Sequence, residues 1–313
     1  MSGVFVRSSM PIRPGCLHRL THEAIAANTE CAPSMKGKTC VITGATSGIG
    51  RVAAERLAQM GARLVLVARD PGRAEVSLAR LRATAPAAAH RVHLADLSRI
   101  AEMKRVAAEI AAAEPRVDLL VNNAGALFGG RRLTEDGLER SFAVNHMAYF
   151  VLAHGLRERL RAAAPARVVN TASTMHRAAW LDFDDLQYAR FYNGVFAYAR
   201  SKLCNVLFTR ELARRWADTG VTVNCFHPGF TRTRFGNQSG PFWAPLVFAA
   251  KAFAIPPAWG ARTLIHLATA PGVADVSGGY FVRCRPAQPS RTAQDDDIAR
   301  RLWDESARIA EIA

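Results

Sequence analysis

The sequence predicts an α/β domain in which helices flank both faces of a doubly wound parallel sheet. Short apolar runs of strand length alternate with longer stretches of helical periodicity through most of the chain. The first run leads through a glycine-rich loop into a helical pattern, which is a typical beginning for such a sheet. With 313 residues, 50% of them hydrophobic, the chain is long enough for one large domain.

Seven runs read as strands because each is short and largely apolar. They cover residues 39–43, 63–68, 92–95, 117–121, 167–171, 221–226 and 279–282. Helical patterns separate the strands, and two late helices are expected at 258–268 and 295–312. A long helix is expected to open at Thr134, Glu135 and Asp136. We therefore expect a seven-stranded parallel sheet.

The loop Gly44-Ala45-Thr46-Ser47-Gly48-Ile49-Gly50 lies between a predicted strand and a predicted helix. In this context glycines allow a tight turn and a close approach of the backbone to a pyrophosphate, which a helix N-terminus attracts. The spacing is G-x-x-x-G-x-G rather than G-x-G-x-x-G, and a plain strand-to-helix turn is the alternative. The candidate cofactor-binding residues are Gly44, Thr46, Ser47, Gly48, Ile49 and Gly50.

The ends of the next two strands bear on the choice of dinucleotide. Arg69 follows the second strand, where an arginine accommodates a ribose 2′-phosphate and a carboxylate binds a free 2′-hydroxyl. Arg69 therefore favours NADP(H) over NAD(H), and Asp70 is more simply a helix N-cap. After the third strand, Asp96 and Leu97 either lie at the adenine, or Asp96 or Ser98 caps the next helix.

Small residues and an amide follow the fourth strand, at Asn123, Ala124 and Gly125. They suit a backbone that passes close to a ligand at the carboxyl edge of the sheet.

One helix, expected over residues 193–216, carries Tyr198 and Lys202 four residues apart. Both side chains therefore leave the same face of the helix. A free phenol titrates at about pH 10 and is a poor base at neutral pH. A nearby ammonium favours the phenolate and brings the phenol pKa closer to neutrality. An ordinary pair of polar surface residues is the alternative.

Three further polar residues are singled out by their positions. Asn145 interrupts an apolar helical pattern, where it either bonds the carbonyl of the preceding turn or holds a water at a kink. Its neighbour His146 is expected to be a core or interface histidine. Ser173 follows the fifth strand and either caps a helix or polarises a substrate carbonyl.

Two segments differ from the rest of the chain. Residues 1–34 lack periodicity and the apolar core of a signal peptide. We expect a disordered or loosely attached tail, or an upstream start with Met35 as the natural beginning, and a domain over 35–313. Residues 230–256 are apolar, rich in aromatic side chains and placed after a strand, which favours a substrate lid over core packing.

Composition argues against several classes of function. The formal charge of +15 would allow an acidic partner, but the basic residues form no block of five and accompany no nucleic-acid motif. No apolar run reaches the roughly 18 residues of a membrane helix. The six cysteines show no C-x-x-C pair or zinc-like spacing, so we expect no metal and a reducing cytoplasm.

Together, these motifs resemble those of the short-chain dehydrogenases/reductases over about residues 36–285. The matching elements are Thr43-Gly44-x-x-x-Gly48-x-Gly50, Asp96, Asn122-Asn123-Ala124-Gly125, Asn145, Ser173, Tyr198-x-x-x-Lys202 and Pro228-Gly229. Finer features, such as Val144-Asn145-His146 and His227-Pro228-Gly229, are similar to the retinol dehydrogenase and WW-domain oxidoreductase branch. The N-terminal anchor and the WW modules of such relatives are not seen here, so their membrane association and partners are not carried over.

The resemblance implies a Rossmann fold and an NADP(H)-dependent oxidoreductase. Tyr198 would be the general acid in reduction and the general base in oxidation. Lys202 would bind the nicotinamide ribose and lower the pKa of Tyr198. Ser173 would hold the substrate oxygen, and Asn145 would keep a water in the proton relay.

In such relatives Pro228, Gly229 and a nearby threonine, here Thr233, contact the nicotinamide. The likeness and the 230–256 segment suggest a lipophilic aldehyde, ketone or alcohol as substrate. Helices around 136–160 and 193–216 form oligomer faces in many relatives, so a homodimer or homotetramer is expected. The alternatives are an idle NADP(H)-binding sensor or scaffold, a nucleic-acid binder, and an extended epimerase or dehydratase relative.

Overall fold

An eight-stranded sheet forms the centre of the computed structural model, which describes residues 34–230 and 255–312. The strand order is β3-β2-β1-β4-β5-β6-β7-β8, and all neighbours are parallel except β7 and β8. The strands are β1 (Thr39–Thr43), β2 (Arg63–Ala68), β3 (Arg91–Leu94), β4 (Leu119–Asn122), β5 (Ala166–Thr171), β6 (Val221–His227), β7 (Tyr280–Val282) and β8 (Arg285–Pro286). The first six strands follow the order of a Rossmann fold.

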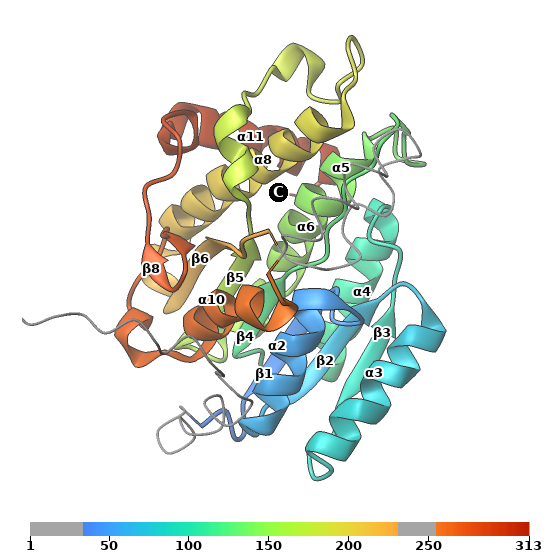
Figure 1. The fold of residues 1–313 in the computed structure, drawn as a ribbon, viewed down its shortest axis with the longest axis vertical. Helices are drawn as coiled ribbons and strands as arrows, with labels where there is room; N and C mark the ends of the chain where they lie inside the picture. Colours follow the sequence, from blue (N-terminus) through green and yellow to red (C-terminus); the bar gives the residue numbers. More distant parts are fainter. Residues whose placement is uncertain (1–33, 231–254, 313) are drawn as a thin grey trace, which may run out of the picture. The chain divides into compact units, whose positions relative to one another are not determined.

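Helices connect the strands and cover both faces of the sheet (Figure 1). The helices are α2 (Gly48–Gln59), α3 (Pro71–Thr84), α4 (Ile100–Ala113), α5 (Arg140–Phe142), α6 (Ala148–Gly155), α7 (Arg157–Arg161), α8 (Gly194–Arg215), α10 (Pro257–Thr269) and α11 (Asp296–Ala310). A π-helix, η1 (Ala143–Met147), joins α5 to α6. Short 3₁₀ turns are η2 (Thr174–Ala178), η3 (Phe183–Asp185), η4 (Ala217–Thr219), η5 (Pro271–Val273) and η6 (Thr292–Gln294).

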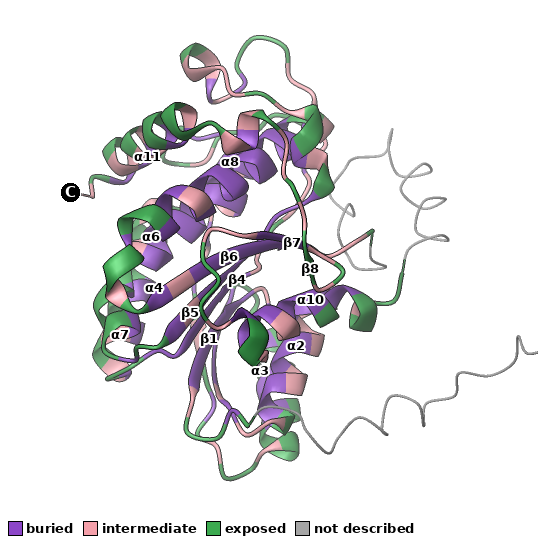
Figure 2. Cartoon of the chain, turned by 90° about the vertical axis from the view of Figure 1, so that its left-hand side faces the viewer, coloured by how far each residue is buried: buried purple, intermediate pink, exposed green. Residues whose placement is uncertain are grey.

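Alternating strand residues build two apolar cores, one on each face of the sheet. On β1, Cys40 and Ile42 belong to the core that includes Leu57 of α2 and residues of α10. Val41, between them, belongs to the core that includes Met103 of α4 and residues of α6, α8 and α11. Both faces of a doubly wound parallel sheet are buried, which explains the nearly continuous apolar runs in the sequence (Figure 2).

The predicted parallel sheet with helices on both faces is confirmed, with one strand more than expected. Strand β8 contains two residues and runs antiparallel to β7. Two residues, one of them proline, are too few to show any strand periodicity, so the sequence carries no signal for β8. The boundaries of the other strands differ from the expected ones by no more than about two residues, which is ordinary for such predictions.

The long helix expected to open at Thr134 begins later and is irregular. An isolated bridge pairs Leu133 with Glu139, and Gly137 in the turn between them has a φ of 73°. Glu139 is the true N-cap, because its side chain accepts a hydrogen bond from the backbone N–H of Phe142. Glu135 and Asp136, which were expected in the first turn of a helix, therefore lie in this turn instead.

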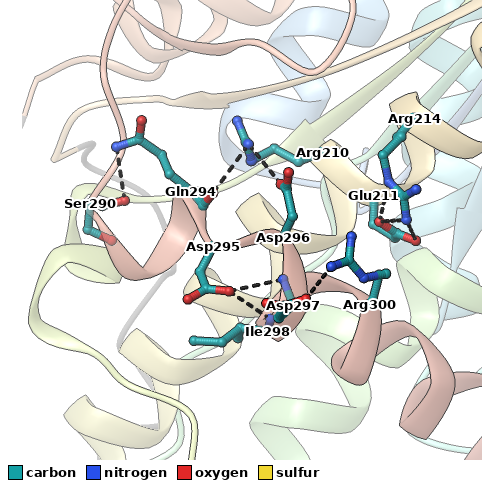
Figure 3. A network of polar contacts seen from close by, with 10 residues as sticks. All are labelled: Arg210, Glu211, Arg214, Ser290, Gln294, Asp295, Asp296, Asp297, Ile298 and Arg300. Atoms are coloured by element: carbon teal, nitrogen blue, oxygen red, sulfur yellow. Dashed lines mark hydrogen bonds and ion pairs between the residues drawn. The ribbon is translucent and has the colours of Figure 1, made fainter.

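Helix α11 packs against α8 and α6 through an apolar centre and a charged edge. The ring of Trp303 lies 5.1 Å from that of Phe150 in α6. At the edge, Arg210 of α8 pairs with Asp296 at 3.1 Å, and Asp295 caps α11 (Figure 3). Helix α11 therefore covers part of the α6 and α8 surface through which an oligomer was expected.

Some sequence expectations lie outside the described residues. These concern nearly all of the tail at 1–34, most of the suggested lid at 230–256, and Thr233. Among the helices that are described, none combines the length and the apolar character needed to cross a bilayer.

Gly194, at the start of α8, allows this helix to approach the loop after β4. A Cβ at this position would lie 2.1 Å from the carbonyl oxygen of Phe128, so alanine would force backbone movement. We expect Gly194→Ala to lower the free energy of unfolding by about 1–3 kcal/mol. Gly130→Ala is the control, because a Cβ there meets nothing within 4 Å. Chemical denaturation that gives both variants the same stability would contradict this steric explanation.

His146 is a buried core histidine, as expected, and its Nε2 lies 2.8 Å from Ser306 Oγ of α11. Burial lowers its pKa to about 3, so the folded protein keeps the ring neutral. The unfolded chain takes up this proton below about pH 6.5, and the associated stability is therefore lost as the pH falls from there towards 3.

Between pH 7.5 and 5 we expect the wild type to lose about 2 kcal/mol more stability than His146→Gln, which has no titrating ring. Urea denaturation at both pH values measures the difference. Parallel pH dependences in the two proteins would show that His146 does not contribute this linkage.

Candidate functional site

A cleft of about 600 Å³ lies at the carboxyl ends of the parallel strands, where the strand order reverses between β1 and β4. Its walls are the loops after β1 to β6 and the first turns of α8. The lining includes the predicted site residues Gly44, Thr46, Ser47, Gly48, Ile49, Arg69, Asp96, Leu97, Asn123, Ala124, Gly125, Ser173, Tyr198, Lys202, Pro228 and Gly229. The structure therefore brings together residues that span most of the chain.

Two predicted site residues, Gly50 and Asn145, lie behind the cleft wall. A Cβ at Gly50 would lie 2.5 Å from both the Asn123 Nδ2 atom and the Gly44 carbonyl oxygen. This glycine therefore lets α2 pack closely against the loop after β4, which is a structural role.

The glycine loop and the loop after β4 are held together by Thr43. Its Oγ1 accepts hydrogen bonds from the backbone N–H groups of Asn123 and Ala124, each at 2.9 Å. Gly44 has a φ of 69°, and a Cβ there would lie 2.9 Å from Ala124 Cα. Only glycine fits this position without moving the backbone. Thr43 is the first residue of the motif recognised in the sequence, where it was given no role of its own.

The N-terminus of α2 faces the cleft without a cap of its own. Ser47, at the N-cap position, makes no side-chain capping hydrogen bond, and the first turn of the helix contains no acidic residue. The N–H groups of such a turn attract anions.

At the end of β2, Arg69 is exposed on the cleft wall. Asp70 is the N-cap of α3, as expected, and accepts a hydrogen bond from the Arg73 N–H at 2.9 Å. Arg73 also lines the cleft and was missed in the sequence, where it looks like any surface arginine of a helix.

Asp96 shapes the loop after β3 and does not cap the following helix. Its Oδ1 accepts hydrogen bonds from the Ser98 N–H at 3.0 Å and the Ser98 hydroxyl at 2.9 Å. The N-cap of α4 is Arg99, so the capping alternative for Asp96 and Ser98 is wrong. A local turn satisfies these side chains before the helix begins.

Asn145 lies in the π-helix η1, and the carbonyl of the preceding turn is not its hydrogen-bond partner. Its Nδ2 donates to the Ala126 carbonyl and to Ser201 Oγ, each at 2.9 Å. Its Oδ1 accepts from the Ala126 N–H at 2.8 Å. The amide therefore fixes the loop after β4 to α8, and a π-bulge is a common way to redirect such a side chain.

Tyr198 and Lys202 lie one turn apart on α8, and both are buried. The Lys202 Nζ donates to the Thr171 carbonyl at the end of β5, at 2.9 Å, and lies 5.7 Å from the centroid of the Tyr198 ring. Burial lowers the pKa of Lys202 to about 7. Burial also raises the pKa of Tyr198 above its ordinary range, and a hydrogen bond with Ser173 opposes part of this rise.

The net shift of the Tyr198 pKa is opposite to the one expected from the sequence. The helical spacing predicted that the ammonium would stabilise the phenolate, and it carries no information on burial. In the folded chain both groups leave water, and desolvation disfavours the charged form of each.

Ser173 is buried beside Tyr198 and is the N-cap of η2, since its Oγ accepts a hydrogen bond from the Met175 N–H at 3.2 Å. The capping alternative is thus confirmed for this serine. It does not exclude a second role, because a hydroxyl both donates and accepts.

Four apolar residues line the same cleft as Tyr198. Phe128, Met175 and Val195 were missed, because they come from different segments that share no local pattern. Phe230 is the first residue of the predicted lid segment 230–256.

Comparisons with known proteins agree with this geometry. The model of the short chain dehydrogenase family matches residues 38–242. Retinol dehydrogenase 14 of Homo sapiens is 41% identical over 286 residues, which cover 86% of this chain and 85% of that protein. Retinol dehydrogenase 13 of Homo sapiens is 40% identical over 290 residues, with coverages of 88% and 85%.

Solved structures show the same likeness. An uncharacterized protein from Mycobacterium paratuberculosis is 30% identical with a TM-score of 0.73, covering 92% of this chain and 97% of that one. An RhlG/NADP active-site complex from Pseudomonas aeruginosa is 27% identical with a TM-score of 0.63, covering 79% and 95%. The chain therefore belongs to the short-chain dehydrogenase/reductase family, in which it resembles the retinol dehydrogenases, and it is an oxidoreductase that acts on CH–OH groups.

Proposed function

We propose that this protein interconverts a lipophilic alcohol and its aldehyde or ketone, with NADP(H) as the hydride carrier. The observation that carries the proposal is the group formed by Ser173, Tyr198 and Lys202, which line one cleft together with the uncapped N-terminus of α2.

The cleft residues fit a dinucleotide. Gly44 leaves no room for a side chain beside Ala124, and the N–H groups at the start of α2 would hold a pyrophosphate. Arg69, exposed at the end of β2, would pair with a ribose 2′-phosphate. RhlG, a relative of the same fold, was solved with NADP, which supports this assignment.

The other predicted contacts follow from their places along the cleft. Asp96 and Leu97 would lie at the adenine, and Asn123, Ala124 and Gly125 would line the path between the two halves of the cofactor. Pro228 and Gly229, after β6, would border the nicotinamide, with Thr233 as a further contact. Once bound, the cofactor supplies or accepts the hydride.

Tyr198 would move the proton that accompanies the hydride. Burial keeps the phenol protonated, so in reduction Tyr198 would give its proton to the carbonyl oxygen. In oxidation the phenol would first have to lose its proton, and the phenolate would then accept the proton of the alcohol. Ser173, hydrogen-bonded to Tyr198, would hold the same substrate oxygen. Its hydroxyl would thereby fix the distance between the phenol and that oxygen.

Lys202 and Asn145 would assist the proton transfer by Tyr198. With a pKa of about 7, Lys202 is close to its titration point at neutral pH and can pass a proton towards Tyr198. Asn145 fixes the backbone of Ala126 at the floor of the cleft and would hold a water of the proton relay.

The lipophilic character of the substrate is supported by apolar residues that line the same cleft as Tyr198. They are Phe128, Met175, Val195 and Phe230. A substrate with a long apolar body would bury that surface while its oxygen lies at Ser173 and Tyr198.

Tyr198→Phe tests the proton transfer. We expect kcat with NADPH and long-chain or retinoid-like aldehydes to fall by about 10²–10⁴-fold, because the general acid is lost. NADPH binding should persist within a few-fold. Tyr280→Phe is the control, since its buried hydroxyl has no hydrogen-bond partner in the described structure and does not line the cleft. NADPH binding by the wild type without turnover of any substrate would favour the idle sensor or scaffold.

Arg69→Ser tests the choice of cofactor. Loss of charge-assisted hydrogen bonds of about 1.5–3 kcal/mol should raise KM for NADPH by about 10- to 100-fold. KM for NADH should change by less than about twofold, because NADH has no 2′-phosphate. Arg82→Ser, on the exposed side of α3 and away from the cleft, controls for the loss of surface charge. Equal effects on both cofactors would contradict the assignment of Arg69.

A further inference from the structure

We propose that His176 is a positioning residue, which holds Ser173 in place in the cleft through a hydrogen bond to its carbonyl oxygen, while Ser290 in the distant C-terminal segment helps to orient the imidazole ring. This inference rests on the proposed role of Ser173 and adds a residue that the sequence motifs do not include.

The imidazole of His176 makes two hydrogen bonds from a fully buried position. Its Nδ1 lies 2.6 Å from the carbonyl oxygen of Ser173, and its Nε2 lies 3.1 Å from the backbone nitrogen of Ser290. A carbonyl oxygen only accepts and a backbone N–H only donates. The ring must therefore be neutral, with its proton on Nδ1. Burial agrees with this, because it lowers the pKa of His176 below the ordinary value.

The same segment is anchored at neighbouring points. The His176 ring meets the edge of Tyr280 on β7, with ring centroids 5.0 Å apart. Arg177 donates to the carbonyl oxygen of Gln288, two residues before Ser290. The 3₁₀ turn η2 is therefore fixed to the chain that follows β8. His176 does not line the cleft, so any effect on the reaction must pass through the residues it holds.

Ser173 is the residue most directly held. Its carbonyl oxygen also accepts a hydrogen bond from the His176 backbone N–H at 3.2 Å. The same oxygen is therefore bound by both the backbone and the side chain of His176. On the other side, the Thr174 N–H donates to His227 Nδ1 at 3.2 Å. These bonds hold both ends of the peptide after Ser173 and thereby restrict the backbone from which Oγ extends towards Tyr198. A displacement of about 1 Å in a reacting group can cost 10²-fold in rate.

Three substitutions test the bonds of His176 to Ser173 and to Ser290, two of them one bond at a time and the third both together. His176→Asn keeps a donor near Nδ1 for Ser173 and loses the acceptor for Ser290. His176→Gln places its amide near Nε2, so it keeps a partner for Ser290 and loses Ser173. His176→Phe keeps the ring contact with Tyr280 and loses both bonds. Thermal denaturation of each variant shows whether it folds.

We expect kcat to fall about tenfold or more in His176→Phe and His176→Gln, and less than about threefold in His176→Asn. KM for NADPH should stay within about twofold in all three, because the cofactor loops are untouched. Should His176→Phe fail to fold, the Asn and Gln variants still decide the matter. A greater loss of kcat in Asn than in Gln would overturn the proposal.

A double-mutant cycle with Ser173→Ala distinguishes positioning from general destabilisation. If His176 acts through Ser173, His176→Phe should lower kcat by less than about twofold in the Ser173→Ala background. A full tenfold loss in that background would assign His176 a merely structural role. If Ser173→Ala alone leaves kcat unchanged, the proposed role of Ser173 fails, and the role of His176 fails with it.

Discussion

The hydrogen bond between the buried Lys202 ammonium and the Thr171 carbonyl fixes the geometry on which the rest of the site depends. Asn205, almost one turn further along α8, donates to the same oxygen at 3.1 Å. Together they set the position of α8 against the end of β5. Because Ser173 comes two residues after Thr171, and Tyr198 one turn before Lys202, this anchor brings both hydroxyls to the same part of the cleft. Burial of the ammonium group costs free energy, because it loses contact with water, and the lowered pKa of Lys202 reflects this cost.

The sequence predicts those parts of the structure whose cause is local. The glycine loop, the Asp70 cap and the single helix carrying Tyr198 and Lys202 each follow from residues within a few positions of one another. The partners of Asn145 and His176 could not be predicted in the same way, because Ser201 and Ser290 are 56 and 114 residues away. The sign of the Tyr198 pKa shift depends on burial, which helical spacing does not report.

Helix α11 changes how the surface of α6 and α8 can be used. Trp303 packs on Phe150 and stacks against Phe208 with ring centroids 6.1 Å apart, and Arg215 lies over the same indole ring. A second chain that approached through these helices would meet α11 first. It would have to displace this aromatic contact or bind beside it, so apolar side chains on α6 and α8 are not evidence of an oligomer face.

In the π-helix η1, the adjacent residues Asn145 and His146 bind different parts of the structure. Asn145 faces the loop after β4 and His146 faces Ser306 on α11, although a regular helix turns by only about 100° between neighbours. A π-turn accommodates one more residue than an α-turn, so the segments before and after it keep independent rotational settings. Deletion of one residue from this stretch would join α5 and α6 into one regular helix. The flanking turns would keep nearly the same register, but the wider turn from which Asn145 and His146 reach different partners would be lost, so the length of this segment is constrained as well as its composition.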